Sequence, residues 1–274
     1  MGRVSDRRRI LRFSDHGGRY RADTLVVEEP LEVQLNGDAY SVTMRTPGDD
    51  VDLALGLLHS ESVITAAADT GTAKHCVDSD LNVLDVTLRV PAPPPRSRFS
   101  ISSACGACGT DNIAALWEHL TPSLRYDVAA DSFVVPVETI IDLPDKLRAS
   151  QRVFDRTGGL HAAALFTADG RLLCVREDVG RHNAVDKVVG WALREDRLPL
   201  SETLLAVSGR VGAEIVQKAA MAGIAVIAAV SAPSTLAIDL AARWGMTVAG
   251  FVRGGHCNIY SGFERIAEAG DQAA

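Results

Sequence analysis

Residues 203–251, TLLAVSGRVGAEIVQKAAMAGIAVIAAVSAPSTLAIDLAARWGMTVAGF, decide the fold of this 274-residue chain. Three short apolar runs in this stretch are typical of buried strands, and the two segments between them have the length and apolar spacing of helices. The alternation predicts a parallel, right-handed layered sheet, because each helix must cross over the sheet before the next parallel strand begins. The predicted strands are residues 203–208, 225–230 and 247–251, and the predicted helices are residues 212–221 and 235–244.

The same α/β pattern extends toward the amino terminus. Residues 162–167 and 172–177 are strand-like and flank an Asp-Gly turn sequence at residues 169–170. A helix is expected over residues 182–194. The α/β portion therefore begins well before the stretch that decides the fold.

The first half of the chain has a different pattern. Residues 31–44 alternate apolar and polar side chains around an Asn-Gly turn at residues 36–37, which predicts a β-hairpin. A helix is expected next, capped by Asp49 or Asp50. A further strand is predicted at residues 82–90, followed by a proline-rich segment. This half reads as a smaller α+β portion. The expected division is a flexible amino-terminal tail at 1–20, the α+β portion at 21–130, an α/β portion at 131–265 and a carboxyl tail at 266–274.

Composition limits the classes of function. The net charge of -7 argues against a general nucleic-acid binder, which needs excess Lys and Arg to neutralise phosphates. The longest apolar run, residues 219–230, is too short to span a bilayer, so we expect no membrane association. The first nine residues contain arginines but no apolar core of a signal peptide follows. We therefore expect a cytoplasmic protein whose five cysteines stay reduced.

The sequence SSACGACG at residues 102–109 places two cysteines, Cys105 and Cys108, among residues too small to bury them. Accessible thiols on a glycine-containing connector are typical of a cysteine that reacts, or that one protein presents to another. The alternative is half of a structural zinc site. A second Cys-x-x-Cys or His-x-His pair is missing from the sequence, so we expect no metal site. The remaining cysteines stand singly at Cys76, Cys174 and Cys257.

Loops rich in small residues follow the three predicted parallel strands. In such sheets ligands bind beyond the carboxyl ends of the strands. Glycines allow close backbone approach, and Arg210 and Arg253 supply donors to an anion, which together favour a phosphorylated ligand. The alternative is that Gly and Ser only make tight turns. The loops are Ser208-Gly209-Arg210-Val211-Gly212, Ser231-Ala232-Pro233-Ser234-Thr235 and Arg253-Gly254-Gly255-His256.

A dense polar cluster covers residues 176–187, REDVGRHNAVDK. It has two interpretations: a solvated helix cap with Asp178 facing helix amides, or a group that reads a base or holds a partner's phosphate. The second would use side chains in the first two turns of one helix. His161, at the start of a strand, is either a structural histidine or a functional one. The candidate residues of the helix are His182, Asn183, Asp186 and Lys187.

In order along the chain, several of these motifs resemble the FdhD family, formate dehydrogenase accessory proteins that act as sulfur carriers. The resemblance covers about residues 20–265. Its most specific part is the cluster at residues 176–187. The other matching segments are Cys105-Gly106-Ala107-Cys108-Gly109, Thr157-Gly158-Gly159-Leu160-His161-Ala162-Ala163, Ser208-Gly209-Arg210, Ser231-Ala232-Pro233-Ser234 and Gly250-Phe251-Val252-Arg253.

The resemblance implies a cytidine-deaminase-like layered sheet that carries the smaller α+β portion. It implies a sulfurtransferase-like carrier that takes sulfur from a cysteine desulfurase and passes it to the bis-molybdopterin guanine dinucleotide of formate dehydrogenase, a molybdenum cofactor bound as substrate or cargo. Cys105 would hold the persulfide and Cys108 would assist. A homodimer is also implied. The implied cofactor-binding residues are Ser208, Gly209, Arg210, Phe251, Val252, Arg253, Gly254, Gly255 and His256.

Two other functions remain open. A thiol-disulfide oxidoreductase would use the same Cys-x-x-Cys chemistry. A nucleotide-binding chaperone of formate dehydrogenase would leave the cysteines incidental. A deaminase is a poor interpretation, because His161 is followed by two alanines rather than by x-Glu, and Cys105 has no neighbouring proline.

Overall fold

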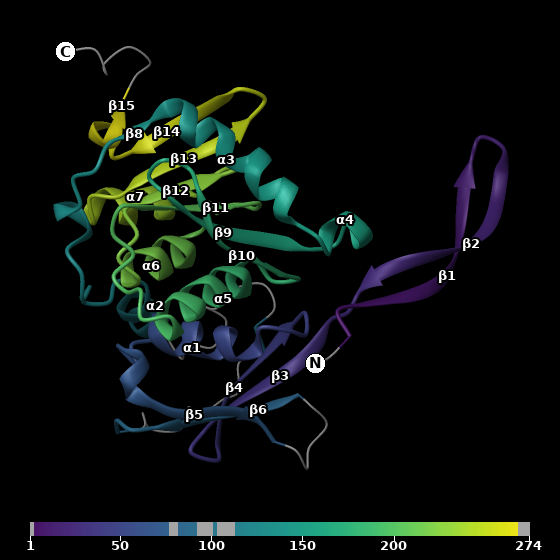
Figure 1. The fold of residues 1–274 in the computed structure, drawn as a ribbon, viewed down its shortest axis with the longest axis horizontal. Coiled ribbons are helices and arrows are strands. Elements are labelled where there is room, and N and C mark those ends of the chain that lie inside the picture. The colour runs from purple at the N-terminus through teal and green to yellow at the C-terminus, as the bar shows by residue number, and fades with distance from the viewer. Residues whose placement is uncertain (1–2, 77–81, 92–100, 103–112, 268–274) are drawn as a thin grey trace.

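The computed structural model of this chain describes residues 3–76, 82–91, 101–102 and 113–267 (Figure 1). It is a mixed α/β structure whose largest element is a six-stranded sheet with strand order β10-β9-β11-β12-β13-β14. The strands are β9 (His161–Thr167), β10 (Leu172–Asp178), β11 (Thr203–Val207), β12 (Val226–Ala229), β13 (Thr247–Arg253) and β14 (His256–Ser261).

The centre of this sheet confirms the alternation predicted from the sequence. Strands β11, β12 and β13 are parallel neighbours, and helices connect them in sequence. At both edges of the sheet, β9, β10 and β14 pair antiparallel with their neighbours. The physical reason is that a tight turn can only join antiparallel strands. The two turns are the predicted one at residues 169–170 and another at Gly254-Gly255.

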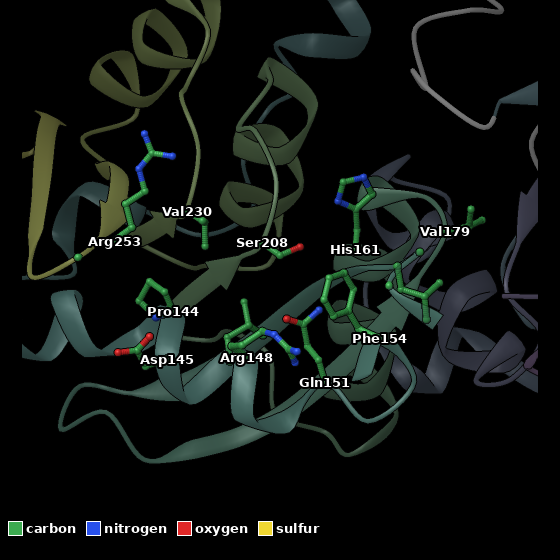
Figure 2. Close-up of a pocket in the computed structure, with 15 residues that line it drawn as sticks. Pro144, Asp145, Arg148, Gln151, Phe154, His161, Val179, Ser208, Val230 and Arg253 are labelled. Atoms are coloured by element: carbon green, nitrogen blue, oxygen red, sulfur yellow. The ribbon is translucent and has the colours of Figure 1, made fainter. Parts of the chain in front are cut away.

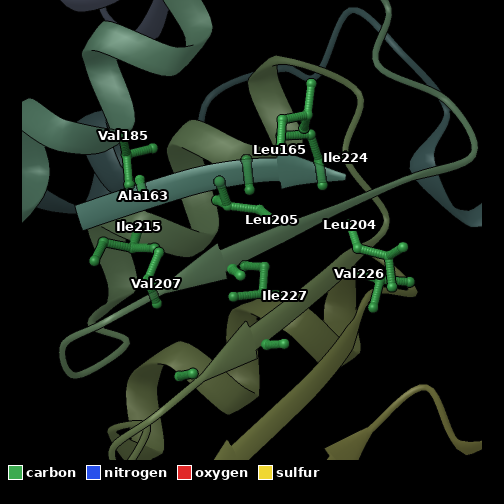
Figure 3. Packing of buried hydrophobic residues seen from close by; sticks show 14 of the residues in the cluster. Ala163, Leu165, Val185, Leu204, Leu205, Val207, Ile215, Ile224, Val226 and Ile227 are labelled. Atoms are coloured by element: carbon green, nitrogen blue, oxygen red, sulfur yellow. The ribbon is translucent and has the colours of Figure 1, made fainter. Parts of the chain in front are cut away.

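Helices cover both faces of the six-stranded sheet. Helices α5 (Arg181–Arg194), α6 (Ala213–Met221) and α7 (Thr235–Arg243) form one layer, and α3 (Val137–Ser150) crosses the strands from the other side. Apolar side chains of the central strands meet those of α5 and α6 (Figure 3). Burying each large aliphatic side chain stabilises the fold by about 1.5–3 kcal/mol. Fully buried members include Leu165, Val185, Leu204, Leu205, Val216, Val226 and Ile227.

The amino-terminal portion is a five-stranded sheet with order β5-β6-β3-β4-β7, packed on helix α1 (Asp50–Ser60). The predicted hairpin, helix and strand are all confirmed. The predicted side-chain cap is wrong. Asp49 occupies the N-cap position with a φ of 54° and no capping bond, and the Asp50 carboxylate binds the Arg45 guanidinium instead. The strands are β3 (Glu29–Leu35), β4 (Asp38–Arg45), β5 (Thr70–His75), β6 (Val83–Leu88) and β7 (Ile101–Ser102).

Helices α1 and α5 join the two portions at a very close crossing. A Cβ built on Gly56 of α1 would overlap the backbone carbonyl of Asp186, and one built on Gly190 of α5 would overlap the carbonyl of Asp52. Only glycine at both positions lets the two backbones touch. The amino-terminal core accordingly includes Leu193 from α5. The two portions therefore share one interface.

The amino-terminal end differs from the irregular tail expected from the sequence. We expected a flexible tail over residues 1–20, but β1 (Ser5–Ser14) and β2 (Gly17–Val26) pair as an antiparallel hairpin that projects from the body (Figure 1). Most of its side chains are exposed on both faces, so the sequence carries no apolar alternation to reveal it. At the other end, β15 (Ile266–Ala267) pairs with β8 (Val135–Pro136), and the rest of the expected carboxyl tail lies outside the described residues.

Short helices complete the described part of the chain. None of the helices there combines the length and apolarity needed to cross a membrane. They are α2 (Ile113–Leu120), α4 (Phe154–Thr157), and the 3-10 turns η1 (Ala67–Asp69), η2 (Val128–Ala130) and η3 (Phe263–Arg265).

The helix crossing generates a stability prediction. Gly190→Ala should destabilise the protein by at least about 2–3 kcal/mol, because the new methyl group meets a rigid backbone carbonyl and the helices must separate. Gly71→Ala is the matched control, since its Cβ meets only ordinary contacts at 3.5 Å. Urea unfolding measures both variants. Equal stability of the two variants would show that the crossing relaxes without cost.

Candidate functional site

A cavity of about 650 Å³ lies where the central strands end (Figure 2). Ser208 follows β11, Val230 follows β12 and Arg253 ends β13. His161 reaches the same edge because its strand, β9, runs antiparallel to β11. Two of the three predicted strand-end loops supply lining residues, Ser208 from one and Arg253 with Gly254 from another, whereas the loop at residues 231–235 does not line the cavity.

Ser208 and Gly209 extend the sheet into the cavity wall. The Ser208 backbone N–H donates to the Ala162 carbonyl at 3.0 Å, and its hydroxyl accepts the Ala162 N–H at 2.9 Å. A Cβ built on Gly209 would lie 3.2 Å from Nδ1 of His161. Glycine at 209 thus lets the imidazole lie against the loop. Ser208 positions the loop through these two bonds, and its hydroxyl, which accepts here, still has its O–H to donate to a ligand.

His161 is the titratable group at this end of the cavity. Burial lowers the pKa of His161, and the positive charges of Arg181 and Arg210 lower it further, against the raising effect of Asp178. The imidazole is therefore neutral at pH 7 and can donate or accept one hydrogen bond. The sequence left the role of His161 open, and the structure places it in the cavity.

Arg253 marks the opposite end of the cavity (Figure 2). It pairs with His256 across a two-residue turn in which Gly254 has φ 60° and Gly255 has φ 77°, values that favour glycine at both positions. The exposed guanidinium lies 5.4 Å from the ring centroid of Phe251, a cation–π contact that orients it. Arg253 can therefore meet an anion without losing an internal ion pair within the described residues.

The other residues of the predicted cofactor-binding segment differ in how deeply they are buried. Gly254 lines the cavity. Gly255 and His256 are exposed in the turn beside it, and the ring of Phe251 supports Arg253. Val252 is completely buried in the core, so its side chain cannot contact a ligand. Val252 faces inward because neighbouring residues of a strand point to opposite faces.

Helix α3 and the start of α4 form a wall that the sequence did not reveal. Arg148 is exposed and its guanidinium lies 4.8 Å from the ring centroid of Phe154. The Glu177 carboxylate fixes this wall, because it accepts the N–H groups of Val153 at 2.9 Å and Phe154 at 2.8 Å. The amphipathic spacing of residues 137–150 was the available signal. Other residues of this wall are Pro144, Asp145, Leu147, Gln151 and Leu160.

The cavity combines cations at its rim with an apolar interior. Arg148 and Arg253 supply guanidinium groups, whereas Phe154 and Leu147 supply apolar surface. Asp145 is the one carboxylate among the lining residues. A ligand with phosphate groups and a planar ring matches this distribution, because guanidinium forks bind phosphate oxygens and the ring can pack on Phe154.

Much of the cluster at residues 176–187 is structural. Asp178 does face an amide at the start of α5, because it accepts the Gly180 N–H at 2.8 Å, but it is buried and not solvated. Asp178 is fully buried and accepts the Thr46 N–H at 3.1 Å and the Asn183 amide at 2.9 Å. Lys187, also buried, lies 2.7 Å from Asp178 and donates to the Thr46 carbonyl. These bonds cross from the α/β portion to the loop after β4. They clamp the two portions together.

Two more residues of the cluster serve the same interface. The Arg176 guanidinium binds the Asp52 carboxylate of α1 at 2.8 Å. Asp186 receives two bonds from Lys218 at 2.7 and 2.9 Å and one from the Ser60 hydroxyl. Solvated side chains would not need this many protein partners. Recognition of a base or of a partner's phosphate is therefore excluded for Asp186 and Lys187.

Val179 of the cluster lines the cavity, whereas His182 lies in the first turn of α5. His182 pairs with Glu214 at 3.4 Å, and its side chain is 13% exposed. Burial lowers the pKa of His182 to about 4, although the Glu214 carboxylate opposes that shift. The imidazole is neutral at pH 7.

Two of the described cysteines, Cys174 and Cys257, are poor nucleophiles. Burial raises the pKa of Cys174 to about 12, and burial also raises the pKa of Cys257. A thiol that stays protonated at pH 7 does not attack a disulfide or persulfide. Cys105 and Cys108 lie outside the described residues. Strand β7, paired with β4, ends three residues before Cys105. Among the described residues no three His, Cys, Asp or Glu side chains are grouped to hold a metal ion.

A model of the FdhD/NarQ family matches residues 26–267. The chain is 50% identical over 271 residues to the sulfur carrier protein FdhD of Nocardia farcinica, covering 97% of this chain and 96% of the relative. It is 51% identical over 278 residues to the protein of the same name in Streptomyces coelicolor, covering 97% of both chains.

A solved structure shares the fold. The crystal structure of a putative formate dehydrogenase accessory protein from Desulfotalea psychrophila matches with a TM-score of 0.77 and 24% identity. The match covers 97% of this chain and all of that one. At this identity the likeness establishes the fold alone.

His182 generates a pH prediction. Its folded pKa of about 4 is below the ordinary value of 6.5, so between these values the unfolded chain binds the extra proton. Stability should therefore fall as pH falls from 6.5 toward 4, by up to about 3 kcal/mol from this residue. In the His182→Asn variant, the urea midpoint should differ less between pH 7.5 and pH 5 than it does in the wild type. His16→Asn, in the exposed turn of the β1–β2 hairpin, is the control. An unchanged pH difference in His182→Asn would contradict the assignment.

Proposed function

This chain belongs to the FdhD/NarQ family, and we propose that it is a sulfur carrier required for formate dehydrogenase activity. The observation that supports a carrier with a ligand site is the cavity where Ser208, His161 and Arg253 converge. Its cationic rim and apolar interior suit a nucleotide-bearing cargo. The six-stranded sheet would then be a variant of the cytidine-deaminase-like layering expected from the sequence.

The sulfur-carrying group in this proposal is Cys105. Its thiolate attacks the outer sulfur of a cysteine desulfurase persulfide, a new S–S bond forms, and the old S–S bond breaks to release the desulfurase thiolate. The sulfane sulfur moves without net oxidation or reduction. Cys108 assists by accepting or shielding the persulfide. The raised pKa values of Cys174 and Cys257 support this choice by removing two competing thiols.

The cargo in this proposal is the bis-molybdopterin guanine dinucleotide of formate dehydrogenase, bound as substrate. One guanosine diphosphate arm would occupy the cavity. Arg253 and Arg148 would hold the diphosphate, and Phe154 would pack against the base. Neutral His161 would donate one hydrogen bond without adding charge. Because the carrier cysteine must be a free thiol before it accepts sulfur, and thiols stay reduced in the cytoplasm, we place the carrier there.

One measurement separates the sulfur carrier from the two alternative functions. The purified protein is incubated with a cysteine desulfurase and cysteine, and intact mass is then determined. A sulfur carrier gains the mass of one sulfur atom. A thiol-disulfide oxidoreductase forms a disulfide and loses two hydrogens, whereas a nucleotide-binding chaperone shows neither change.

The carrier proposal predicts a clear order of cysteine variants. Cys105→Ser should abolish activation of formate dehydrogenase and the gain of sulfur mass, because a hydroxyl cannot hold sulfane sulfur. Cys108→Ser should do less harm. Cys257→Ser is the control and should keep full activation. Full activation by Cys105→Ser in a strain that depends on this protein would refute the proposal, and greater damage from Cys108→Ser would reassign the carrier.

The cargo proposal predicts guanine nucleotide binding in the cavity. Arg253→Ala should weaken guanosine diphosphate binding by roughly ten- to a hundredfold, since a charge-assisted contact contributes about 1.5–3 kcal/mol. Arg171→Ala, in the turn between β9 and β10, is the control with unchanged affinity. Calorimetry compares guanosine and adenosine diphosphates. Equal affinity for both would remove the guanine assignment, and no binding of either would remove the site.

A further inference from the structure

Gln151 is a buried polar residue in the cavity wall. It is 3% exposed and lines the cavity. Its side-chain amide forms no hydrogen bond with any residue that the structure describes. Buried polar side chains are nearly always hydrogen-bonded, because an unpaired one costs free energy of folding. This amide therefore has its donor and its acceptor available to whatever enters the cavity.

The backbone of Gln151 is held at the junction of α3 and α4. Its N–H donates to the Arg148 carbonyl at 3.3 Å, and its carbonyl accepts the Asp155 N–H at 3.1 Å. Both backbone groups are thus used inside the protein. Figure 2 shows the Gln151 side chain beside the Phe154 ring, within the cavity. A planar ring that packs on Phe154 would bring its edge within reach of the amide.

Gln217 shows how a structural glutamine is arranged in this protein. It is 2% exposed, and its Nε2 donates to the Ser60 carbonyl at 3.1 Å. This bond links α6 to the end of α1 and stabilises the packing of the two helices. Gln151 has the same side chain and similar burial, but it has no such bond among the described residues. The comparison separates a glutamine that holds the fold together from one that faces a binding site.

The charged and the uncharged polar groups of the cavity lining match different parts of a nucleotide. The guanidinium groups of Arg148 and Arg253 match phosphate oxygens. The edge of a base is uncharged, and the amide of Gln151 and the neutral imidazole of His161 are uncharged as well. A planar amide presents one donor and one acceptor side by side. Guanine presents the complementary pair, the O6 acceptor and the N1–H donor.

We propose that Gln151 recognises the edge of the base of the bound nucleotide. Nε2 donates to O6 of guanine and Oε1 accepts from N1–H, while the base packs on Phe154. This assignment rests on the nucleotide cargo proposed above. Rotation of the amide about its terminal bond would present the same pair of groups to adenine, in the opposite order. Gln151 therefore distinguishes a nucleotide from a diphosphate without a base, and it does not by itself separate guanine from adenine.

Gln151→Met tests the proposal, because methionine has a similar size and shape but no amide. Calorimetry on the full chain compares guanosine diphosphate with inorganic pyrophosphate, which carries the phosphates without a base. Gln151→Met should weaken guanosine diphosphate binding by roughly ten- to a hundredfold, as expected for two lost bonds to a base edge. Its affinity for pyrophosphate should not change. Gln217→Met is the matched control, and both of its affinities should equal those of the wild type.

Urea unfolding without ligand separates recognition of a base from a structural role. Gln151→Met should be at least as stable as the wild type, because the substitution removes a buried amide that has no bond to the described part of the protein. Gln217→Met should be less stable, because the Ser60 carbonyl loses this donor. The two substitutions are chemically identical, so only the surroundings of each glutamine can produce the difference.

Three results would overturn the role of Gln151 and leave the cargo proposal intact. The first is guanosine diphosphate binding by Gln151→Met that is as tight as in the wild type. The second is an equal loss of guanosine diphosphate and pyrophosphate binding, and the third is a loss of stability as large as that of Gln217→Met. A wild type that binds no nucleoside diphosphate would instead remove the cargo proposal, and this assignment with it.

Discussion

The contact between the backbones of α1 and α5 is the constraint on which the rest of the structure depends. Gly56 and Gly190 each face a carbonyl of the opposite helix with no room for a Cβ. Packed helices usually keep 8–10 Å between their axes because side chains separate them. Two glycines remove those side chains here. The five-stranded sheet is thereby held against the layer of helices that covers the six-stranded sheet.

Buried charges make this contact specific. Asp178 and Lys187 on one side meet Thr46 on the other, and Arg176 reaches Asp52 of α1. Breaking one partner of such a pair leaves an uncompensated charge in the interior, which is costly. These groups therefore fix how α1 and the β4 loop sit on α5. The loop that contains Thr46 follows directly after β4, and β4 pairs with β7. Strand β7 is the last described strand before the two candidate sulfur-carrying cysteines.

The strands and the buried polar contacts described above also hold the walls of the cavity in place. Its floor is formed by strand ends, and its other wall is held by Glu177, which lies next to the buried Asp178 on β10. The cluster at residues 176–187 thus contributes Val179 to the cavity lining, and it acts indirectly through Glu177 and through the charge of Arg181 near His161. Positioning of this kind lowers the ordering cost of binding a ligand.

The sequence by itself determined the central strands and helices, the hairpin at residues 36–37 and the convergence of Ser208 and Arg253, because these follow from local apolar periodicity and from the geometry of parallel sheets. Only the tertiary structure decided that residues 176–187 are buried, that Val252 points into the core and that α3 closes the cavity. The physical reason is that a charged residue has the same local pattern whether water or a distant carboxylate satisfies it. The partner of Lys187 is nine residues away on another element, and its second partner, Thr46, is more distant still, so burial depends on contacts that no local pattern encodes.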